Sequence, residues 1–211
     1  MASVDLKVVL LGQSDVGKTC LVDRYLNGKY QDTISPTVGA AFGAKKLYVG
    51  DRPLTVGVWD TAGAERFEAM SRLYYRAARA ACVCYDLTRA ETWPKVKFWI
   101  NELLSFEKEC ALYIVGTKAD LLEEGVPRGV EASEVADYAR QINAQVFDAL
   151  LIPCPHVTFE TSSKKGYSVE DLFDTIVYDF VKRGAGGEVP LGGGGGGDVI
   201  TPSEAPPACS C

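Results

Sequence analysis

The residues best suited to chemistry in this sequence lie near its start, at positions 12–19, Gly-Gln-Ser-Asp-Val-Gly-Lys-Thr. The pattern of glycine, four residues, glycine, lysine and threonine is typical of a phosphate-binding loop. The glycines let the backbone fold closely around an anion, and successive N–H groups with a helix N-terminus supply partial positive charge. Lys18 adds a full charge, and the hydroxyl of Thr19 can bind the Mg²⁺ that accompanies phosphates. We therefore predict a nucleotide phosphate site here.

The sequence around this loop is that of a strand followed by a helix. The apolar run 8–11 precedes it, and a helical pattern through Leu21 and Leu26 follows. The residues expected to line the nucleotide are Asp15, Val16, Gly17, Lys18, Thr19 and Cys20.

Composition restricts the remaining possibilities. The chain has 211 residues, enough for one domain with a tail, and its formal charge of −6 comes without a dense basic block, which argues against a nucleic-acid partner. The N-terminus has no secretory pattern, and no apolar run approaches the 18 residues expected of a membrane span. Seven cysteines without zinc-ligand spacing are typical of a cytosolic protein with reduced thiols.

Strand-like and helical segments alternate along the chain. Strands are predicted at 6–11, 42–49, 53–59, 80–87, 110–116 and 157–160, and helices at 18–27, 66–78, 92–108, 131–148 and 168–182. The alternation predicts an α/β fold: a doubly wound, mostly parallel six-stranded sheet with one antiparallel strand and about five helices. Gly50-Asp51-Arg52 is typical of a hairpin turn between the second and third strands. Ligands of such sheets bind at the carboxyl ends of the strands.

Three further motifs follow predicted strands. Asp60, with Gly63 three residues on, places a carboxylate where it can hold Mg²⁺ through water and a glycine N–H where it can meet a γ-phosphate. Thr117-Lys118-Ala119-Asp120 presents a carboxylate that can accept two hydrogen bonds from guanine, a donor pair that adenine lacks. Ser162, Ser163 and Lys164 follow the last strand and offer a backbone N–H to the guanine carbonyl. Four motifs in this order indicate a guanine-nucleotide site.

With these motifs, residues 5 to about 182 resemble a Rab-family small GTPase. The resemblance also rests on Thr37-Val-Gly-Ala-Ala-Phe42, Trp59-Asp-Thr-Ala-Gly63, Glu65-Arg-Phe67, Leu73-Tyr-Tyr-Arg76 and Tyr85-Asp-Leu-Thr88. The details at 39–42, 67–75, 116–124 and 159–164 are most similar to the atypical Rab twenty-four subfamily.

The resemblance implies a P-loop small G domain over residues 5–183 that binds GTP or GDP with Mg²⁺. Thr19, Thr37 and Asp60 would provide the metal ligands. Thr37, in the first switch, would become ordered when a γ-phosphate is present, and Tyr30 takes the position of an aromatic residue that packs edge-on against guanine.

The resemblance also implies an effector surface. Phe42, Trp59 and Tyr74 match the aromatic triad that Rab proteins present to their effectors. Trp59 lies between the two switch segments in the family, so effector contact is the favoured interpretation and internal packing the alternative.

Three positions depart from the family pattern. Ala64 replaces the glutamine that orients the attacking water, which leaves Lys18 as the expected catalytic residue and predicts slow intrinsic hydrolysis. Thr117 replaces asparagine, and its hydroxyl can make fewer hydrogen bonds than an amide. Asp15 brings a carboxylate close to the phosphates. The last two changes predict faster nucleotide release than from a standard Rab protein.

Residues 147–157, Phe-Asp-Ala-Leu-Leu-Ile-Pro-Cys-Pro-His-Val, form a long connection before the last strand. A lineage-specific surface loop and a splice-derived insertion both explain it. Its histidine, His156, has no second ligand or carboxylate nearby in the sequence, so we expect no catalytic or metal role.

Residues 184–211 are rich in glycine, then proline and serine, and end in Cys209-Ser210-Cys211. This composition predicts a flexible tail. A Cys-x-Cys ending resembles a Rab site for two geranylgeranyl groups at Cys209 and Cys211, and two lipid chains suffice for stable membrane anchoring. Two incidental thiols are the alternative.

We therefore expect a Rab-type switch that binds and slowly hydrolyses GTP and recruits effectors in vesicle trafficking, with a link to autophagy. The alternatives are a nearly non-hydrolysing GTP-bound membrane scaffold and a P-loop kinase or ATPase, which Asp120 disfavours. The resemblance implies as partners an exchange factor, a GTPase-activating protein, Rab escort protein and GDP-dissociation inhibitor. It places the protein in the cytosol and on the cytoplasmic face of the endoplasmic reticulum, late endosome or autophagosome.

Overall fold

The computed structural model describes residues 4–63, 73–147 and 157–184. The strands are β1 (Leu6–Gly12), β2 (Ala40–Val49), β3 (Arg52–Thr61), β4 (Ala80–Asp86), β5 (Ala111–Thr117) and β6 (Val157–Glu160). The helices among these residues are α1 (Lys18–Asn27), the 3-10 helix η2 (Ala90–Thr92), α3 (Trp93–Phe106), α4 (Ala119–Glu123), α5 (Ala132–Phe147) and α6 (Val169–Gly184).

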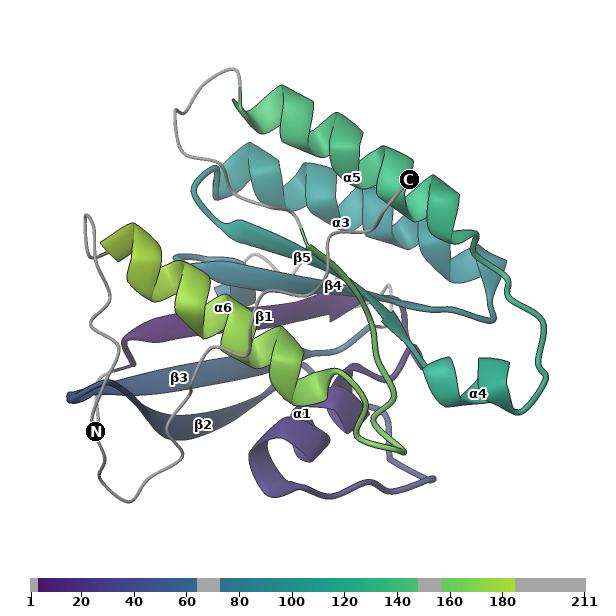
Figure 1. The fold of residues 1–211 in the computed structure, drawn as a ribbon, viewed down its shortest axis with the longest axis horizontal. Helices are drawn as coiled ribbons and strands as arrows, with labels where there is room; N and C mark the ends of the chain where they lie inside the picture. Colours follow the sequence, from purple (N-terminus) through teal and green to yellow (C-terminus); the bar gives the residue numbers. More distant parts are fainter. Residues whose placement is uncertain (1–3, 64–72, 148–156, 185–211) are drawn as a thin grey trace.

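The six strands form one sheet in the order β2-β3-β1-β4-β5-β6. β2 pairs antiparallel with β3, whereas the other four pairings are parallel (Figure 1). This order and these directions confirm the predicted α/β fold. Because the strand order reverses beside β1, loops that leave the carboxyl ends of β1 and its neighbours meet at one edge of the sheet.

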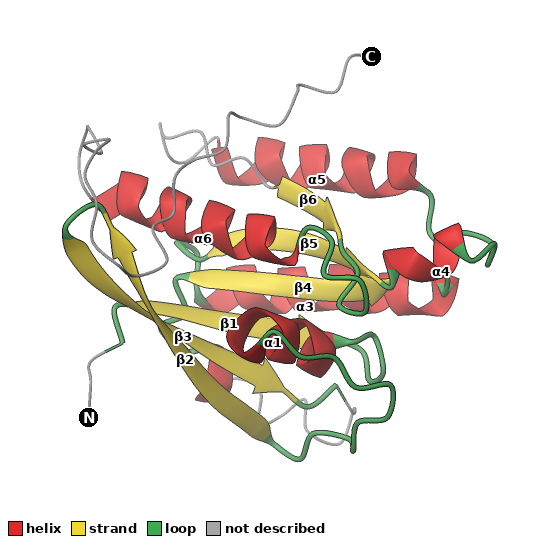
Figure 2. Cartoon of the chain, turned by 60° about the horizontal axis from the view of Figure 1, so that its bottom comes forward, coloured by secondary structure: helices red, strands yellow, loops and turns green. Residues whose placement is uncertain are grey.

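The sheet separates two apolar cores. On one face, α1 and α6 cover the side chains of Val8, Leu10 and Cys82, and on the other, α3 and α5 cover Val9, Leu11 and Val83. Figure 2 shows α1 and α6 in front of the sheet and α3 behind it. Strands buried on both faces read as continuous apolar runs, which is why β1, β4 and β5 could be predicted from sequence.

The hairpin between β2 and β3 is longer than the sequence indicated. Pairing runs from Val49 opposite Arg52 to Ala40 opposite Thr61, so both strands gain two residues at the end near the nucleotide motifs. Gly50 takes a positive φ of 58°, as glycine does at the first position of tight two-residue hairpin loops.

Other differences are small. The helix α4 was not predicted, because five residues are too few for a helical period to show. The last helix continues to Gly184, one residue beyond the predicted domain end at 183. Most of the predicted helix 66–78, the segment 148–156 and the tail from 185 onward lie outside the described residues. In the part of the chain that is described, no helix is long and apolar enough to cross a membrane.

A packing test follows from the core beneath α6. Phe173 is fully buried, and its ring stacks on that of Tyr25 of α1 with centroids 3.7 Å apart. Truncating Phe173 to alanine removes the aromatic contact and leaves a cavity, so we expect the free energy of unfolding to fall by about 3–5 kcal/mol. Urea denaturation at one fixed GDP concentration measures this change. Tyr178→Ala on the same helix is the control, because Tyr178 is 37% exposed, and its loss of stability should be clearly smaller than that of Phe173→Ala. Equal losses in the two variants would contradict the packing account.

Candidate nucleotide-binding site

The four predicted motifs lie at the same edge of the sheet. β1 ends at Gly12, β3 at Thr61, β5 at Thr117 and β6 at Glu160, and these strands run parallel to one another through β4. Three of the motifs begin at or directly after one of these ends, and the fourth begins at Asp60, one residue before β3 ends. The fold therefore brings together segments that are more than 100 residues apart in the chain.

The phosphate loop is shaped by glycine and closed by its lysine. Gly12 has a φ of 139°, and a Cβ there would lie 2.3 Å from the carbonyl oxygen of Cys84, so no side chain fits. The buried Lys18 Nζ donates to the carbonyl oxygens of Gly12 (3.0 Å) and Gln13 (2.8 Å). Burial lowers the pKa of Lys18, and the carboxylates of Asp60 and Asp15 oppose this shift. The ammonium is thus held beside the loop backbone.

The start of α1 is suited to an anion. Its first turn has no acidic residue, and no side chain caps it, so its N–H groups are not used by a cap. A cavity of about 130 Å³ lies in front of this turn, between the loop, residues 34–37, Thr61 and Gly63. A Cβ on Gly63 would lie 2.4 Å from the backbone nitrogen of Ser14, which explains why glycine is needed where this segment meets the phosphate loop.

Three oxygen ligands meet beside the cavity. The hydroxyl of Thr19 donates to Asp60 Oδ2 at 2.6 Å, and that of Thr37 donates to the same atom at 3.2 Å. The two hydroxyl oxygens lie 3.0 Å apart. Asp60 is 2% exposed, and among the described residues its Oδ1 has no hydrogen-bond partner.

This donor set fits Mg²⁺, which prefers oxygen ligands and is commonly held by one carboxylate, hydroxyls and phosphate oxygens. Burial raises the pKa of Asp60, an effect that the hydroxyls of Thr19 and Thr37 and the charge of Lys18 partly reverse. A bound cation would stabilise the ionised carboxylate further.

The base-recognition motifs form a second buried cluster. Asp120 accepts a hydrogen bond from Ser162 Oγ at 2.5 Å, and Ala119 N donates to Thr161 O at 3.0 Å. Lys118 has a left-handed φ of 62°, and its Nζ lies 2.9 Å from the buried carboxylate of Asp86. The motif at 117–120 and the one at 161–164 therefore support each other.

Thr117 connects this cluster to the phosphate loop. Its hydroxyl oxygen lies 2.5 Å from the carbonyl oxygen of Val16 and 2.8 Å from that of Tyr85, and the side chain is buried. Although threonine has fewer donors than asparagine, it still contacts the loop backbone. Faster nucleotide release than from a standard Rab protein stays a prediction.

Two other predicted residues lie on α1 and shortly after it. Burial raises the pKa of Cys20, which is half-buried on the first turn of α1. Burial also raises the pKa of Tyr30, and the carboxylate of Asp32 adds to this shift.

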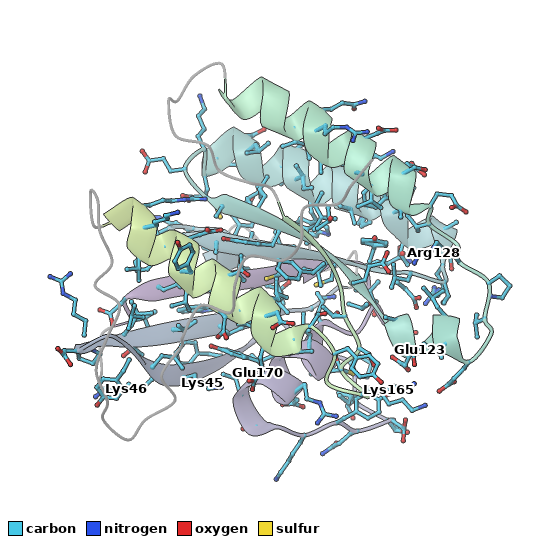
Figure 3. All side chains as sticks on the ribbon, in the orientation of Figure 1. Lys45, Lys46, Glu123, Arg128, Lys165 and Glu170 are labelled. Carbon is cyan, nitrogen blue, oxygen red and sulfur yellow. The ribbon has the colours of Figure 1, made fainter. Side chains whose placement is uncertain are left out.

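Sequence reasoning missed the residues that hold the base loop. Arg24 of α1 donates to the carbonyl oxygens of Ser163 (2.6 Å) and Lys164 (2.7 Å). Lys164 forms an ion pair with Glu124, and Lys165 forms one with Glu123. Figure 3 labels Glu123, at the end of α4, and Lys165, on the loop that follows β6. In the sequence, the acidic pair Glu123-Glu124 and the lysine pair Lys164-Lys165 each lie next to a base-recognition motif. These two pairs were the available indication of the contacts.

The predicted effector residues are only partly brought together. Phe42 and Trp59 face each other across β2 and β3, with ring centroids 4.7 Å apart, and Phe42 is 58% exposed. Lys7 Nζ lies 4.6 Å from the centroid of the Trp59 ring. Tyr74 is half-buried beside Gly39, where a Cβ would lie 3.1 Å from its hydroxyl. Ala64, Cys209 and Cys211 lie outside the described residues.

Comparison with known proteins agrees with this geometry. The model of the Ras family matches residues 7–182. The chain is 47% identical to Ras-related protein Rab-24 of Dictyostelium discoideum over 188 residues, which cover 89% of this chain and 87% of that protein. It is 38% identical to the Ras-like GTP-binding protein RYL2 of Yarrowia lipolytica over 84% of this chain and 81% of that protein. It is 39% identical to human Ras-related protein Rab-21 over 79% of this chain and 68% of that protein.

The fold and the site define a Ras-type G domain. The chain belongs to the Ras family and, within it, to the Rab small GTPases. Membership implies binding of guanine nucleotides and Mg²⁺ and a role in vesicle trafficking.

The bond between Thr117 and the phosphate loop gives a direct test. Thr117→Val preserves the side-chain shape but leaves the buried carbonyl of Val16 without its partner, which costs about 1–3 kcal/mol. If the GDP-bound state bears this cost, GDP release becomes faster by about 5- to 150-fold. Stopped-flow release of labelled GDP measures the rate. Thr175→Val is the matched control, because the hydroxyl of Thr175 donates a hydrogen bond to the carbonyl oxygen of Asp171 on α6, away from the site. An unchanged rate for Thr117→Val would show that the bond does not support nucleotide binding.

Proposed function

We propose that the chain is a guanine-nucleotide switch with weak intrinsic GTPase activity that recruits trafficking effectors through Phe42, Trp59 and Tyr74. The observation that carries the proposal is the meeting of Thr19, Thr37 and Asp60 at hydrogen-bond distances. These residues come from the phosphate loop, the first switch and the end of β3. Mg²⁺ bound there would neutralise charge on the β- and γ-phosphates.

The switch depends on Thr37. Its segment contributes Ile34, Ser35 and Pro36 to the wall of the phosphate cavity, and its hydroxyl reaches Asp60. A γ-phosphate can contact this segment only when GTP is bound. GTP and GDP therefore favour different states of the switch. Ala62 N donates to Gly39 O at 2.8 Å, which connects the first switch to the motif that begins at Asp60.

Hydrolysis is the step in which this chain departs from its family. Lys18, fixed by Gly12 and Gln13, can stabilise charge on the phosphates. The methyl group of Ala64 cannot hold the attacking water, so positioning of the nucleophile is missing. An activating protein that contributes both an arginine and a glutamine can restore it.

Single-turnover hydrolysis tests this proposal. We expect slow conversion of bound GTP by the purified protein, faster conversion by Ala64→Gln, and acceleration of the unaltered protein by a catalytic Rab-activating domain. The expected gain from a correctly placed group is about 10²-fold or more. Fast hydrolysis by the unaltered protein alone would contradict the role given to Ala64.

A second candidate function also rests on Ala64. If neither the protein alone nor the activating domain gives turnover, the chain is a GTP-bound membrane scaffold controlled by the supply of nucleotide and partners. A P-loop kinase or ATPase is disfavoured because the Asp120 carboxylate can accept hydrogen bonds from guanine, whereas adenine lacks that donor pair. Binding of ATP in competition with GTP would favour the kinase or ATPase.

The tail from 184 to 211 is proposed as a lipid anchor, with geranylgeranyl groups on Cys209 and Cys211. Rab escort protein would present the chain for lipidation, and GDP-dissociation inhibitor would extract it from the membrane. The proposed compartments are the cytosol and the cytoplasmic face of the endoplasmic reticulum, late endosome or autophagosome. The proposed link to autophagy rests on the resemblance to the Rab twenty-four subfamily, and the chain is 47% identical to one protein of that name.

The double variant Cys209→Ser/Cys211→Ser tests the anchor. Because one chain gives only marginal membrane binding, we expect a single variant to shift part of the protein to the soluble fraction and the double variant to shift nearly all of it. Fractionation of cells that express each form measures this distribution. Retention of the double variant on membranes would contradict lipid anchoring.

A further inference from the structure

Asp15 is an unusual residue for the place it occupies. It has a left-handed φ of 64°, a conformation that costs free energy for residues other than glycine, although aspartate tolerates it better than most. Asp15 is among the residues that line the phosphate cavity, and its carboxylate is among the charges that affect Lys18. A free carboxylate at this position would repel the phosphates of a bound nucleotide.

Arg89 pairs with this carboxylate. The guanidinium NH1 of Arg89 lies 3.3 Å from Asp15 Oδ2, and its Nε donates to Glu91 Oε1 at 2.8 Å. Arg89 is 36% exposed, whereas the Asp15 side chain is 82% exposed. The planar guanidinium can serve both carboxylates at once, which a single ammonium group does less well.

The backbone of Arg89 is held by a network of hydrogen bonds. Its N–H donates to Asp86 O at 3.1 Å, and the hydroxyl of Thr92 donates to Arg89 O at 2.7 Å. The carboxylate of Asp86 in turn pairs with Lys118 of the base motif and accepts hydrogen bonds from Thr88. The turn that carries Arg89 is therefore the same one that positions Lys118.

We propose that Arg89 is a positioning residue for nucleotide binding: it holds the Asp15 carboxylate to the side of the phosphate cavity and neutralises its charge. The chain thereby tolerates an acidic residue in its phosphate loop. The inference rests on the proposed nucleotide site and identifies a residue outside its four motifs. It also limits the effect that Asp15 alone was expected to have on nucleotide release.

A double-mutant cycle on GDP release tests the inference. Arg89→Gln removes the charge, and we expect GDP release to become about two- to fivefold faster at low salt, the range of an exposed ion pair. In an Asp15→Gly background there is no carboxylate to neutralise, so Arg89→Gln should have no effect there. A residue that merely stabilises the turn would speed release equally in both backgrounds.

Salt dependence and a matched control complete the test. At about 1 M salt the Debye length is about 3 Å, so the effect of Arg89→Gln should shrink. Arg140→Gln is the control, because Arg140 pairs with an exposed acid, Asp137, on α5. It should leave GDP release unchanged.

Additive effects of the two substitutions, or an Arg89→Gln effect that salt does not reduce, would overturn the inference while leaving the nucleotide site intact. Failure of the unaltered protein to bind GDP would instead overturn the proposed function and the inference with it.

Discussion

Burying the Asp60 carboxylate at the end of β3 costs free energy that its surroundings must offset. Two threonine hydroxyls donate to one of its oxygens, and Lys18 contributes a favourable charge. The other oxygen has no partner among the described residues. A bound cation would stabilise this arrangement further. The hydrogen bonds connect the phosphate loop, the first switch and the sheet in one network.

The same principle organises the base side of the site. Asp86 and Asp120 are buried, and each is matched by a specific partner, Lys118 for the first and Ser162 for the second. Thr117 and Arg24 connect this cluster to the phosphate loop and to α1. Because the partners come from distant parts of the chain, nucleotide binding and the stability of this sheet edge are coupled.

Much of this architecture could be predicted from the sequence. Strands such as β4 and β5 are continuous apolar runs, and the four motifs have fixed spacings with a chemical reason for each residue. The motifs also indicated which residues would meet, since carboxyl ends of parallel strands share an edge.

The residues that could not be predicted are those whose role depends on a tertiary distance. Arg24 and Arg89 lie on a helix and a turn with ordinary local sequences, and nothing local indicates that they reach Ser163 or Asp15. The short helix α4 has no detectable period, and the extension of β2 to Ala40 follows from pairing with β3 rather than from β2 alone. Local sequence patterns predict helices and strands, whereas ion pairs between distant elements can be identified only once the tertiary structure is known.

The account depends most directly on a guanine-nucleotide site completed by Mg²⁺ at Thr19, Thr37 and Asp60. The most direct measurement is the rate of release of labelled GDP with Mg²⁺ present and after chelation with EDTA, with unlabelled GDP or ADP as competitor. The account predicts slow release with Mg²⁺, faster release after chelation, and competition by GDP but not by ADP. Release that is insensitive to chelation, or equal competition by ADP, would contradict it.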